Sequence, residues 1–568
     1  MKSGSALRIR LISGFVFLFA VILISKLYLL QIVHRSDFAS QADRQYVRPP
    51  QYTFNRGTVY LQSKNGSLVS GATVKTGYII VINPKLLADA EAAYQKISQI
   101  ITVDHDDFMM RAGKKSDTYE EIAKKVDEDK GKAIEALKIP GVNIYEDRWR
   151  LYPGGELAAH VLGFVGYKGD ELAGRYGLER SFDDVLKRNA DSMYVNFFAE
   201  MFSNIKNIAK DQPLEGDIVT TLEPSVQTLL QQKVAAVNKQ WGSDSTGALV
   251  INPKNGEIYA MALHPTFNPN SFSSEKSADV FSNFMVEDVR EMGSIIKPLT
   301  IAAGLDSGVI TPATTYNDTG CIILNTKSIC NFDGKARGVT PMQEVLNHSL
   351  NLGVSFVTKK MGNEKFTEYF KNFGLGEKTG IDLPNEATGL ISNLDTPRDL
   401  EHANASFGQG IAITPLETVR ALASLGNGGY LINPHVVKRV NYKIGYSKET
   451  PIEKGRQVIS EATSKEITRM LVNVVDVALL NGKAKNLHYS VAAKTGTAQI
   501  SLPGGGGYYA DRYLHSFFGY FPAKDPQFLV FLYTIYPKGV KYASETLTEP
   551  FLDISKFLIN YYEIPPDR

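Results

Sequence analysis

Three short strings whose residue types could do chemistry occur in one order along this chain. They are Ser294 to Lys297 (Ser-Ile-Ile-Lys), Ser349 to Asn351 (Ser-Leu-Asn) and Lys494 to Gly496 (Lys-Thr-Gly). A serine hydroxyl is a weak nucleophile at neutral pH and needs a base within hydrogen-bond reach. On a helix, a lysine three positions after a serine lies on the same face and can supply that base. The strings therefore predict a serine acyl-transfer site.

The order of the strings is informative because each one alone also occurs elsewhere. Further matches to Ser-x-x-Lys, Ser-x-Asn or Lys-Thr-Gly begin at Ser203, Ser273, Ser63, Lys75 and Lys378. Requiring the three strings in sequence removes most of these matches, because only Ser349 to Asn351 follows any Ser-x-x-Lys. The choice of the upstream serine and of the downstream lysine stays open at this point.

Local context favours Ser294 and Lys494. Ser203 and Ser273 lie among polar residues that are typical of surface loops, and Lys378 stands in a loop rich in glycine and proline. Lys494 instead follows an apolar run and leads into a segment with strand character. An edge strand can offer its backbone to an extended peptide, and the absent side chain of Gly496 permits close approach.

The residues around Ser294 favour a helix that begins there. Gly293 precedes the serine and Pro298 follows Lys297, and proline is tolerated only in the first turn of a helix. The N-terminus of such a helix adds partial positive charge and free N–H groups where an oxyanion would form. Lys297 can act as a base only if it loses its proton near pH 7, which burial and a neighbouring Lys494 would favour.

Other readings of single residues are open. Ser349 and Asn351, taken alone, could cap a helix that begins near Gly353. The run from Gly504 to Gly507 favours a flexible hairpin tip over a phosphate loop. The histidines are scattered singly and no metal-ligand spacing occurs, so the sequence predicts neither a metal site nor a cofactor.

The elements expected around the site alternate between strand and helix. From a boundary near residues 213–217, the patterns predict a strand at 218–222, a helix from 223 to about 240, and a hairpin over 247–262 that turns at Asn255-Gly256. Further strands are expected at 492–500, 516–521 and 528–536. Strands at both ends with helices between them predict an α+β domain whose sheet is closed by distant segments.

The N-terminus carries a candidate membrane anchor. Residues 11–33 contain a single charge, Lys26, and supply the ~20 apolar residues that a bilayer requires. Lys2, Arg8 and Arg10 precede this segment with no acidic residue among them, which predicts a cytoplasmic N-terminus and an external chain beyond it. A cleaved signal peptide is the competing reading, but its apolar core usually spans only about 7–15 residues.

Length and composition predict several globular domains. A chain of 568 residues exceeds one core, and its net charge of +2 argues against a nucleic-acid footprint. Between the anchor and residue 213, the patterns predict strands near 54–60, 78–82 and 141–145, and helices over 86–101 and 120–137. The second helix would carry a densely charged, solvated face.

Cys321 and Cys330 are the only cysteines in the sequence. They flank two apolar arms around a polar Asn-Thr-Lys-Ser turn, which predicts a hairpin that brings the thiols across from each other. In an oxidising exterior compartment that arrangement favours a disulfide, and buried free thiols are the alternative.

Segments outside the three strings complete a family pattern. They are Arg56-Gly57, 157–163 (LAAHVLG), 177–179 (GLE), 379–384 (TGIDLP), 408–410 (GQG), 508–519 and 542–544 (YAS). With them the chain resembles, over nearly its whole length, a class B penicillin-binding protein, the family of D,D-transpeptidases that act on peptidoglycan. The resemblance implies an α+β fold with a cytoplasmic tail (1–10), a single transmembrane helix (11–33), an elongated dimerisation-type pedestal (34–215) and a transpeptidase domain (216–568). That last domain would hold a β-lactamase-like antiparallel sheet flanked by helices.

The resemblance also implies a role for each candidate residue. Ser294 would attack the penultimate D-alanine carbonyl of a stem pentapeptide, expel the terminal D-alanine and pass the acyl group to an amine of a neighbouring stem peptide. Lys297 resembles the general base, and Ser349 with Lys494 the proton relay and carboxylate anchor. Asn351 would hold the substrate amide, and β-lactams would act as inhibitors. The terminal carboxylate region would lie at Thr495 and Thr497, and the oxyanion hole at the backbone N–H groups of Ser294 and Thr497.

Two positions depart from the family pattern. Met292 stands where the family commonly has proline, and Ile296 replaces a common phenylalanine. Neither change removes a catalytic group, but both are expected to alter helix packing and β-lactam affinity.

The resemblance implies partners as well. No region before the pedestal is large enough for a glycosyltransferase, so it implies a SEDS-type polymerase (FtsW- or RodA-like) and divisome proteins at the cytoplasmic membrane. The pedestal resembles division-type (FtsI-like) more than elongation-type enzymes, which predicts septal cell-wall synthesis. The competing hypotheses are an elongation-type transpeptidase, a D,D-carboxypeptidase or β-lactam sensor, and a non-catalytic scaffold that binds stem peptides.

Overall fold

The computed structural model describes residues 54–188, 214–504 and 506–568, together with seven residues between positions 14 and 26. The chain divides into two compact units, one of residues 76–148 with the segment up to 54, and one of residues 55–75 and 149–568. The predicted anchor at 11–33 lies largely outside the described residues. Within the described parts of the chain, no helix combines the length and the apolar character that crossing a bilayer requires.

The first unit has a small core of its own between a sheet and three helices. Its central strand is the second part of β2, which pairs with β3 and β4. Apolar side chains of β2 pack with those of all three helices. The elements are β2 (Leu68–Ile82), α3 (Ala90–Ser98), α4 (His105–Ala112), β3 (Glu120–Val126), α5 (Glu128–Ala136) and β4 (Val142–Leu151).

The predicted helix over 120–137 is wrong in its first half. Glu120–Val126 is the strand β3, antiparallel to β2, and only Glu128–Ala136 is helical. Asp127, in an extended conformation, separates the strand from the helix. The charged residues of this segment suit a helix locally, but the backbone pairs along β2 and Val126 is buried, so tertiary pairing overrides the local preference.

In the second unit, residues 55–75 and 149–188 belong to the predicted pedestal and pack around one buried carboxylate. Glu179 is fully buried and accepts hydrogen bonds at 2.6 Å from the guanidinium groups of both Arg56 and Arg150. The Tyr152 hydroxyl donates to the same carboxylate at 3.2 Å. Arg56 also pairs with Asp183 at 2.7 Å. Removing Glu179 would leave the buried Arg150 without its carboxylate partner and Arg56 with only one, so Glu179 holds this part of the fold together.

This part of the second unit contains short helices and paired strands. A mixed sheet has the order β15-β14-β7-β1 followed by the first part of β2. The elements are β1 (Val59–Gln62), α6 (Ala159–Leu162), β5 (Val165–Lys168), β6 (Glu171–Gly174), α7 (Gly177–Ser181), α8 (Asp183–Leu186), β7 (Gly216–Thr220), β14 (Val437–Tyr442) and β15 (Ser447–Glu449).

The rest of the second unit is built on a five-stranded sheet with the order β16-β17-β18-β8-β9. Every neighbouring pair is antiparallel, which confirms the predicted sheet. The strands come from both ends of the domain sequence: β8 (Ser245–Ile251), β9 (Ile258–His264), β16 (Ala492–Ser501), β17 (Tyr508–Phe521) and β18 (Phe528–Ile535). Because β16 is the last strand of the order, one of its edges is unpaired within the sheet.

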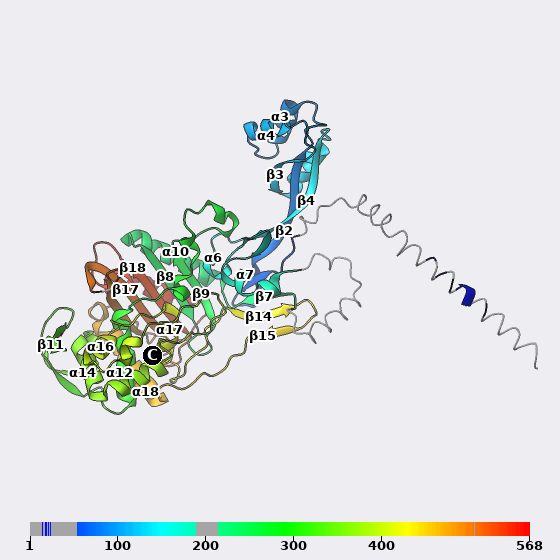
Figure 1. Cartoon of the computed structure of the whole chain (residues 1–568). Helices are drawn as coiled ribbons and strands as arrows, with labels where there is room; N and C mark the ends of the chain where they lie inside the picture. The colour runs from blue at the N-terminus through cyan, green and yellow to red at the C-terminus, as the bar shows by residue number, and fades with distance from the viewer. Residues whose placement is uncertain are drawn as a thin grey trace, which may run out of the picture. The chain divides into compact units, whose positions relative to one another are not determined.

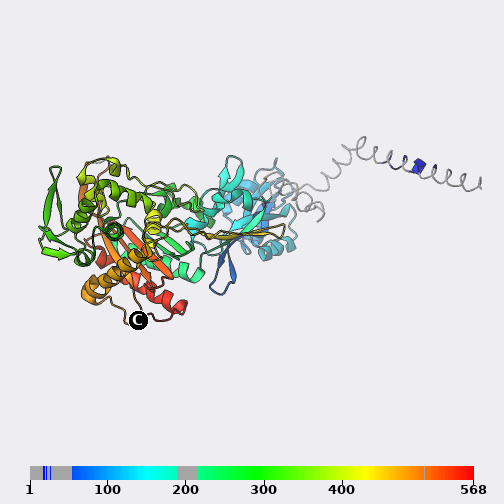
Figure 2. The same cartoon turned by 90° about the horizontal axis from the view of Figure 1, so that it is seen from below.

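Alternating side chains bury the two faces of this sheet in different cores. Ala248 and Val250 of β8 pack with α10 (Pro224–Trp241) and α20 (Thr548–Tyr561), whereas Leu249 and Ile251 face the other core. Figure 1 shows α10 beside β8 and β9, and Figure 2 shows α20, in red, next to the orange strands. This period of two is the pattern of a sheet that is covered on both sides.

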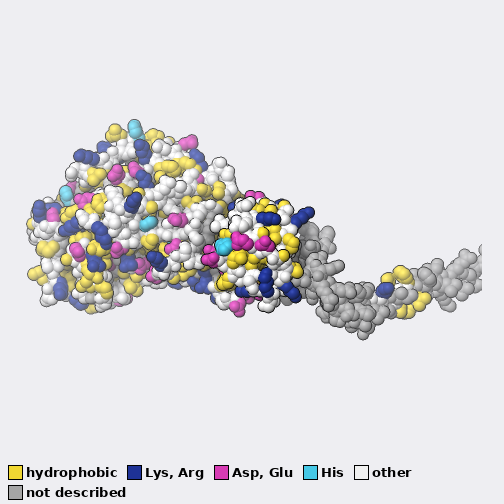
Figure 3. Space-filling model, turned by 90° about the horizontal axis from the view of Figure 1, so that it is seen from above, with side chains coloured by type: hydrophobic (Ala, Val, Ile, Leu, Met, Phe, Trp, Pro, Cys, Tyr) yellow, Lys and Arg dark blue, Asp and Glu magenta, His cyan; other side chains and the backbone are white. Residues whose placement is uncertain are grey.

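The helices of the second core lie between β9 and β16 in the sequence, as expected for an α+β domain. They are α11 (Phe284–Glu287), α12 (Lys297–Asp306), α13 (Met342–Asn347), α14 (Asn351–Met361), α15 (Asn363–Asn372), α16 (Asp399–Ala405), α17 (Pro415–Ala423) and α18 (Glu461–Asn473). A short further helix, α19 (Ala543–Thr546), follows β18. Two small antiparallel sheets, β10 (Thr315–Asp318) with β13 (Gly338–Pro341) and the hairpin β11 (Cys321–Leu324) with β12 (Lys327–Cys330), accompany them. The face in Figure 3 carries basic and acidic side chains intermixed.

Candidate active site

Ser294 lies on a single 3₁₀ turn, Gly293–Ile296, that leads directly into α12. The backbone N–H of Lys297 donates to the Ser294 carbonyl, so serine and lysine are one turn apart, as the spacing predicted. Ser294 is half-buried and lines a cavity of about 770 Å³. Met292 and Ile296, the two departures from the family pattern, are fully buried on either side of it.

Gly293 lets the strand β16 approach the nucleophile. Its φ is +65°, and a Cβ built there would lie 2.8 Å from the carbonyl oxygen of Thr497. A larger residue would strain the turn and push β16 away. The turn is further held by Ser516, whose hydroxyl donates to the Met292 carbonyl at 2.9 Å.

Ser349 stands between two lysines. The Nζ of Lys297 donates to its hydroxyl oxygen at 3.1 Å and to its carbonyl at 2.5 Å, and the Nζ of Lys494 donates to the same hydroxyl at 3.0 Å. The structure thus brings residues from α12, the α13–α14 junction and β16 together around one oxygen. These hydrogen bonds link Lys297 to Lys494 through the Ser349 hydroxyl, and such a link can relay a proton within the cavity that Ser294 lines.

Both lysines are removed from water. Lys297 is 0% exposed and Lys494 is 3% exposed. Burial, together with the charge of Lys494, holds the pKa of Lys297 well below its usual value, and burial lowers the pKa of Lys494 to about 7. A neutral amine that can accept a proton at neutral pH is therefore available beside Ser349.

Ser349 and Asn351 do not cap the N-terminus of α14 with their side chains. The residue that caps α14 is Leu350, and no side chain caps it. Ser349 has a φ of +54°, a left-handed conformation that is unfavourable for serine and common at functional sites. The side-chain amide of Asn351 donates to the Cys330 carbonyl at 2.8 Å, which leaves its oxygen available at the cavity.

Thr495 and Thr497 point to the same side of β16 and line the cavity with Lys494. Gly496 between them faces the core, where an added Cβ would lie 2.4 Å from the Ser516 hydroxyl. The Thr497 hydroxyl accepts from the backbone N–H of Ala543 at 3.2 Å, so α19 fixes this side of the strand. An extended peptide could pair with the open edge of β16, as predicted.

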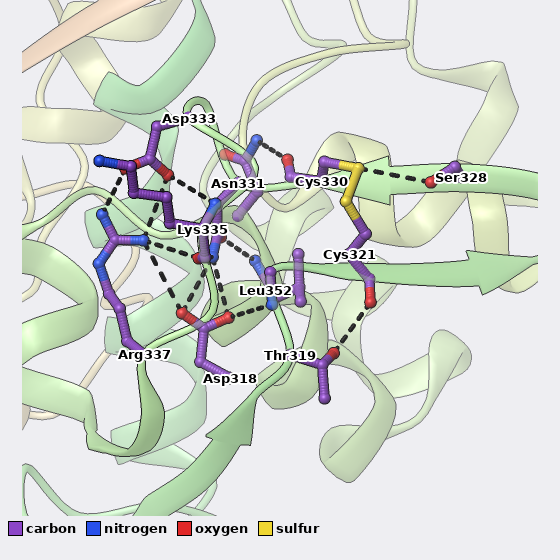
Figure 4. The surroundings of a disulfide bond; sticks show 12 residues. Asp318, Thr319, Cys321, Ser328, Cys330, Asn331, Asp333, Lys335, Arg337 and Leu352 are labelled. Carbon is purple, nitrogen blue, oxygen red and sulfur yellow. Dashed lines mark hydrogen bonds and ion pairs between the residues drawn. A yellow bond between two sulfur atoms is a disulfide. The ribbon is translucent and has the colours of Figure 1, made fainter.

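The Cys321–Cys330 hairpin borders the cavity from the other side. The two cysteines are opposite each other in the β11–β12 register and are joined by a disulfide. Figure 4 shows how the chain continues from it: the buried Asn331 donates to Asp318 at 2.9 Å and accepts from the backbone N–H of Leu352. The hairpin therefore positions the start of α14, and with it Asn351.

We expect the double replacement of Cys321 and Cys330 by serine to lower the free energy of unfolding by about 2–3 kcal/mol, because the short loop regains freedom in the unfolded chain. Denaturant unfolding of both forms, with and without reductant, measures the loss. The serine variant should not respond to reductant. Equal free energies of unfolding of the wild type and the serine variant in the absence of reductant would contradict the expectation.

Several functional contacts were not visible as motifs. Glu291 accepts hydrogen bonds from the Gly410 backbone and the Tyr508 hydroxyl, and thereby links the nucleophile turn to the Gly408 loop and to β17. A Cβ at Gly408 would lie 2.2 Å from the Gly293 carbonyl. These residues are far apart in the sequence, and only the segments 408–410 and 508–519 of the family resemblance pointed to them.

The rejected matches to the strings lie away from the site. Ser273 is exposed in a short 3₁₀ segment, Lys276 is exposed just after it, and Lys378 is exposed in its loop. Ser203 lies outside the described residues. Among the described matches to Ser-x-x-Lys and to Lys-Thr-Gly, only those that begin at Ser294 and Lys494 line the cavity.

Comparison with known proteins identifies the domains in which these residues lie. Residues 246–555 match the family model of the penicillin binding protein transpeptidase domain, and residues 53–221 match that of the penicillin-binding protein dimerisation domain. Stage V sporulation protein D of Bacillus subtilis is 31% identical over 95% of this chain and 83% of its own length. The peptidoglycan D,D-transpeptidase FtsI of Escherichia coli K12 is 27% identical over 99% of this chain and 92% of its own length. A crystal structure of penicillin-binding protein 3 from Mycobacterium tuberculosis with aztreonam superposes with a TM-score of 0.68 at 23% identity, over 90% of this chain and 97% of that one.

The chain belongs to the penicillin-binding protein family. Its dimerisation domain precedes its transpeptidase domain, which makes it a class B member and a transpeptidase, as the sequence predicted.

Proposed function

We propose that this chain is a peptidoglycan D,D-transpeptidase that crosslinks stem peptides through a Ser294 acyl-enzyme and releases D-alanine. The observation that carries the proposal is the Ser349 hydroxyl, which lies within 3.1 Å of two buried lysines in the cavity that Ser294 lines. The names of the FtsI and sporulation relatives support the same activity class.

The first half of the proposed reaction acylates the enzyme. Neutral Lys297 takes the Ser294 proton while the Ser294 oxygen attacks the penultimate D-alanine carbonyl. The backbone N–H groups of Ser294 and Thr497 stabilise the oxyanion. The proton reaches the leaving nitrogen through Ser349 and Lys494, and the terminal D-alanine leaves with its carboxylate beside Thr495 and Thr497. Asn351 holds the peptide amide.

The second half transfers the acyl group to an amine of a neighbouring stem peptide. That amine attacks the ester carbonyl, a new amide bond forms, and the bond to the Ser294 oxygen breaks as the oxygen regains its proton. β-Lactams would acylate Ser294 in the same way and act as inhibitors, as expected of this family.

We place the enzyme in the cytoplasmic membrane, with residues 1–10 inside, a single anchor at 11–33, and the pedestal (34–215) and transpeptidase domain (216–568) outside. The described residues Phe17, Leu18 and Phe19 are helical and exposed, which suits contact with lipid. The division-type resemblance of the pedestal supports a role in septal synthesis with a SEDS-type polymerase and divisome proteins.

One reaction tests this function. The detergent-solubilised full chain is incubated with a stem pentapeptide that ends in D-alanyl-D-alanine and with an amine-bearing stem peptide. We expect release of D-alanine together with a crosslinked dimer, and a β-lactam should block both. Release without a dimer would indicate a carboxypeptidase, and binding without release a scaffold; either result would overturn the proposal.

A further inference from the structure

A second cavity shares the Cys321–Cys330 hairpin with the active site. Its volume is about 480 Å³, which lies within the size range of small-molecule sites. The wall is formed mainly by β10, β11, α14 and α16 (Figure 1), and much of it is apolar. The apolar side chains include Tyr316, Ile322, Leu324, Leu352 and Phe356. We call this space the second cavity.

The hairpin is a common wall of the two cavities. Ser328 and Ile329 of β12 line the catalytic cavity, whereas Ile322 and Leu324 of β11 line the second one. The disulfide joins the two strands at one end. At the other end, the side-chain oxygen of Asn325 accepts a hydrogen bond from the backbone N–H of Leu400 at 3.1 Å, which fastens the turn to α16.

The first two turns of α14 form another part of the wall. Leu352 and Ser355 line the second cavity, and the Ser355 hydroxyl donates to the Asn351 carbonyl at 2.9 Å. None of the residues assigned to catalysis lines this cavity. A molecule bound there would therefore contact the helix that carries Asn351 without occupying the place of the substrate.

The wall of the second cavity contains a buried donor without a partner. Tyr316 is 7% exposed, and its ring stacks on that of Phe356 with centroids 5.7 Å apart. Its hydroxyl has no hydrogen-bond partner among the described residues. Because buried polar groups in proteins are almost always hydrogen-bonded, water or a bound molecule has to supply the missing acceptor.

The second cavity also has two charged groups, Lys359 and Asp399. Asp399 lies in the first turn of α16 and accepts a hydrogen bond from the side-chain amide of Asn363 at 2.8 Å. Lys359 is exposed in the last turn of α14 and forms no ion pair within the described parts of the chain. The carboxylate therefore has a donor, whereas the ammonium group is free to pair with an anion.

We propose that the second cavity is a binding site for a small monocarboxylate with an apolar body. The apolar body packs against Ile322, Leu324 and Phe356, and the carboxylate pairs with Lys359 at the mouth. Burial of apolar surface supplies most of the affinity, and the ion pair sets the orientation. The inference does not depend on the proposed function, because the site lies outside the catalytic cavity.

The probe for this site is 4-phenylbutyrate, which combines one ring, a short chain and a carboxylate. Ligand-observed NMR titration of the detergent-solubilised full chain, with a protein-free detergent blank, measures its dissociation constant. A probe of this size is expected to bind at about 0.1–1 mM. The neutral 4-phenylbutyramide should bind about two- to fivefold more weakly, because it cannot form the partly exposed ion pair with Lys359.

Two substitutions test the two halves of the site. Lys359→Met removes the charge and keeps an apolar stem, so the preference for the carboxylate over the amide should disappear. Lys360→Met is the matched control, because Lys360 is also exposed but does not line the cavity, and it should keep the preference. Ile322→Trp places a larger side chain in the wall and should abolish binding of both probes. Thermal unfolding checks that each variant is folded.

A second arm separates this site from the catalytic cavity. The chain is first acylated with a penicillin and freed of the excess, and the titration with 4-phenylbutyrate should then be unchanged. Loss of binding after acylation would place the probe in the catalytic cavity and overturn the proposal. Absence of saturable binding, or a preference for the carboxylate that persists in Lys359→Met, would overturn it as well, while release of D-alanine and crosslinking would be unaffected by any of these results.

Discussion

Replacing Ser294 by alanine is expected to abolish covalent labelling by a fluorescent penicillin, with a loss in acylation rate of about 10⁴-fold or more. The side chain removed is the proposed nucleophile, and no other described serine combines a lysine three residues later with a place in the cavity. The fold should survive, because Ser294 is half-buried and the turn depends on Gly293 and Ser516. Gel fluorescence after timed incubation of the full chain measures the label.

Ser273→Ala is the matched control for this experiment. Ser273 also precedes a lysine by three residues but lies exposed in a short 3₁₀ segment, so its removal should leave labelling unchanged. Thermal unfolding of each variant separates a lost nucleophile from a lost fold. A folded Ser294→Ala chain that still carries the label would refute the assignment of the nucleophile.

Replacing Lys297 by arginine is expected to slow acylation by about 10²–10⁴-fold, the usual contribution of a general base. Arginine keeps a positive charge but does not give up its proton, so it cannot receive one from Ser294. In the wild type the neutral lysine is the active form. The rate should therefore be highest above pH 7 and fall as the pH drops through the lowered pKa values of the buried pair, about 7 for Lys494.

The pH profile of the second-order acylation rate, taken on wild type and variants, checks this prediction. Lys494→Met tests the direction of the pKa shift of Lys297. Because the neighbouring charge lowers this pKa, its removal should raise the pKa, and the fall of the residual activity toward acid should then occur at higher pH. Lys378→Arg, in the exposed second Lys-Thr-Gly string, should leave the profile unchanged. A wild-type rate that stays level as the pH falls below 7 would contradict the assignment of a neutral lysine as base.

The chemistry of this site could be predicted from the sequence because its groups lie in short strings with regular spacing. Ser294 and Lys297 need only one helical turn to share a face, and the strand of Lys494 is marked by the apolar residues before it. The sheet was predictable for the same reason, since each strand carries its own apolar pattern. The disulfide-bonded hairpin also followed from two arms and a polar turn.

The features of the fold and the site that the sequence did not predict depend on contacts between residues far apart in the chain. Residues 120–126 have the composition of a charged helix and become a strand only because β2 lies beside them. The carbonyl of Cys330 that holds Asn351, and the Ser516 hydroxyl that holds the nucleophile turn, are contacts across 21 and 224 positions. No local sequence pattern predicts that a particular backbone oxygen or a single hydroxyl will be a hydrogen-bond partner.

The strand order of the catalytic sheet has a consequence for how the domain folds as the chain is synthesised. β8 has β18 as one of its neighbours, with Ile251 opposite Leu529, so nearly the whole domain must be synthesised before this pairing can begin. Such distant pairings form slowly. The nascent chain therefore carries β8 unpaired on one side until β18 has been made. The catalytic strand β16 gains its place in the sheet only when β17 and β18 connect it to β8, so the acylation site cannot assemble before these late strands are present.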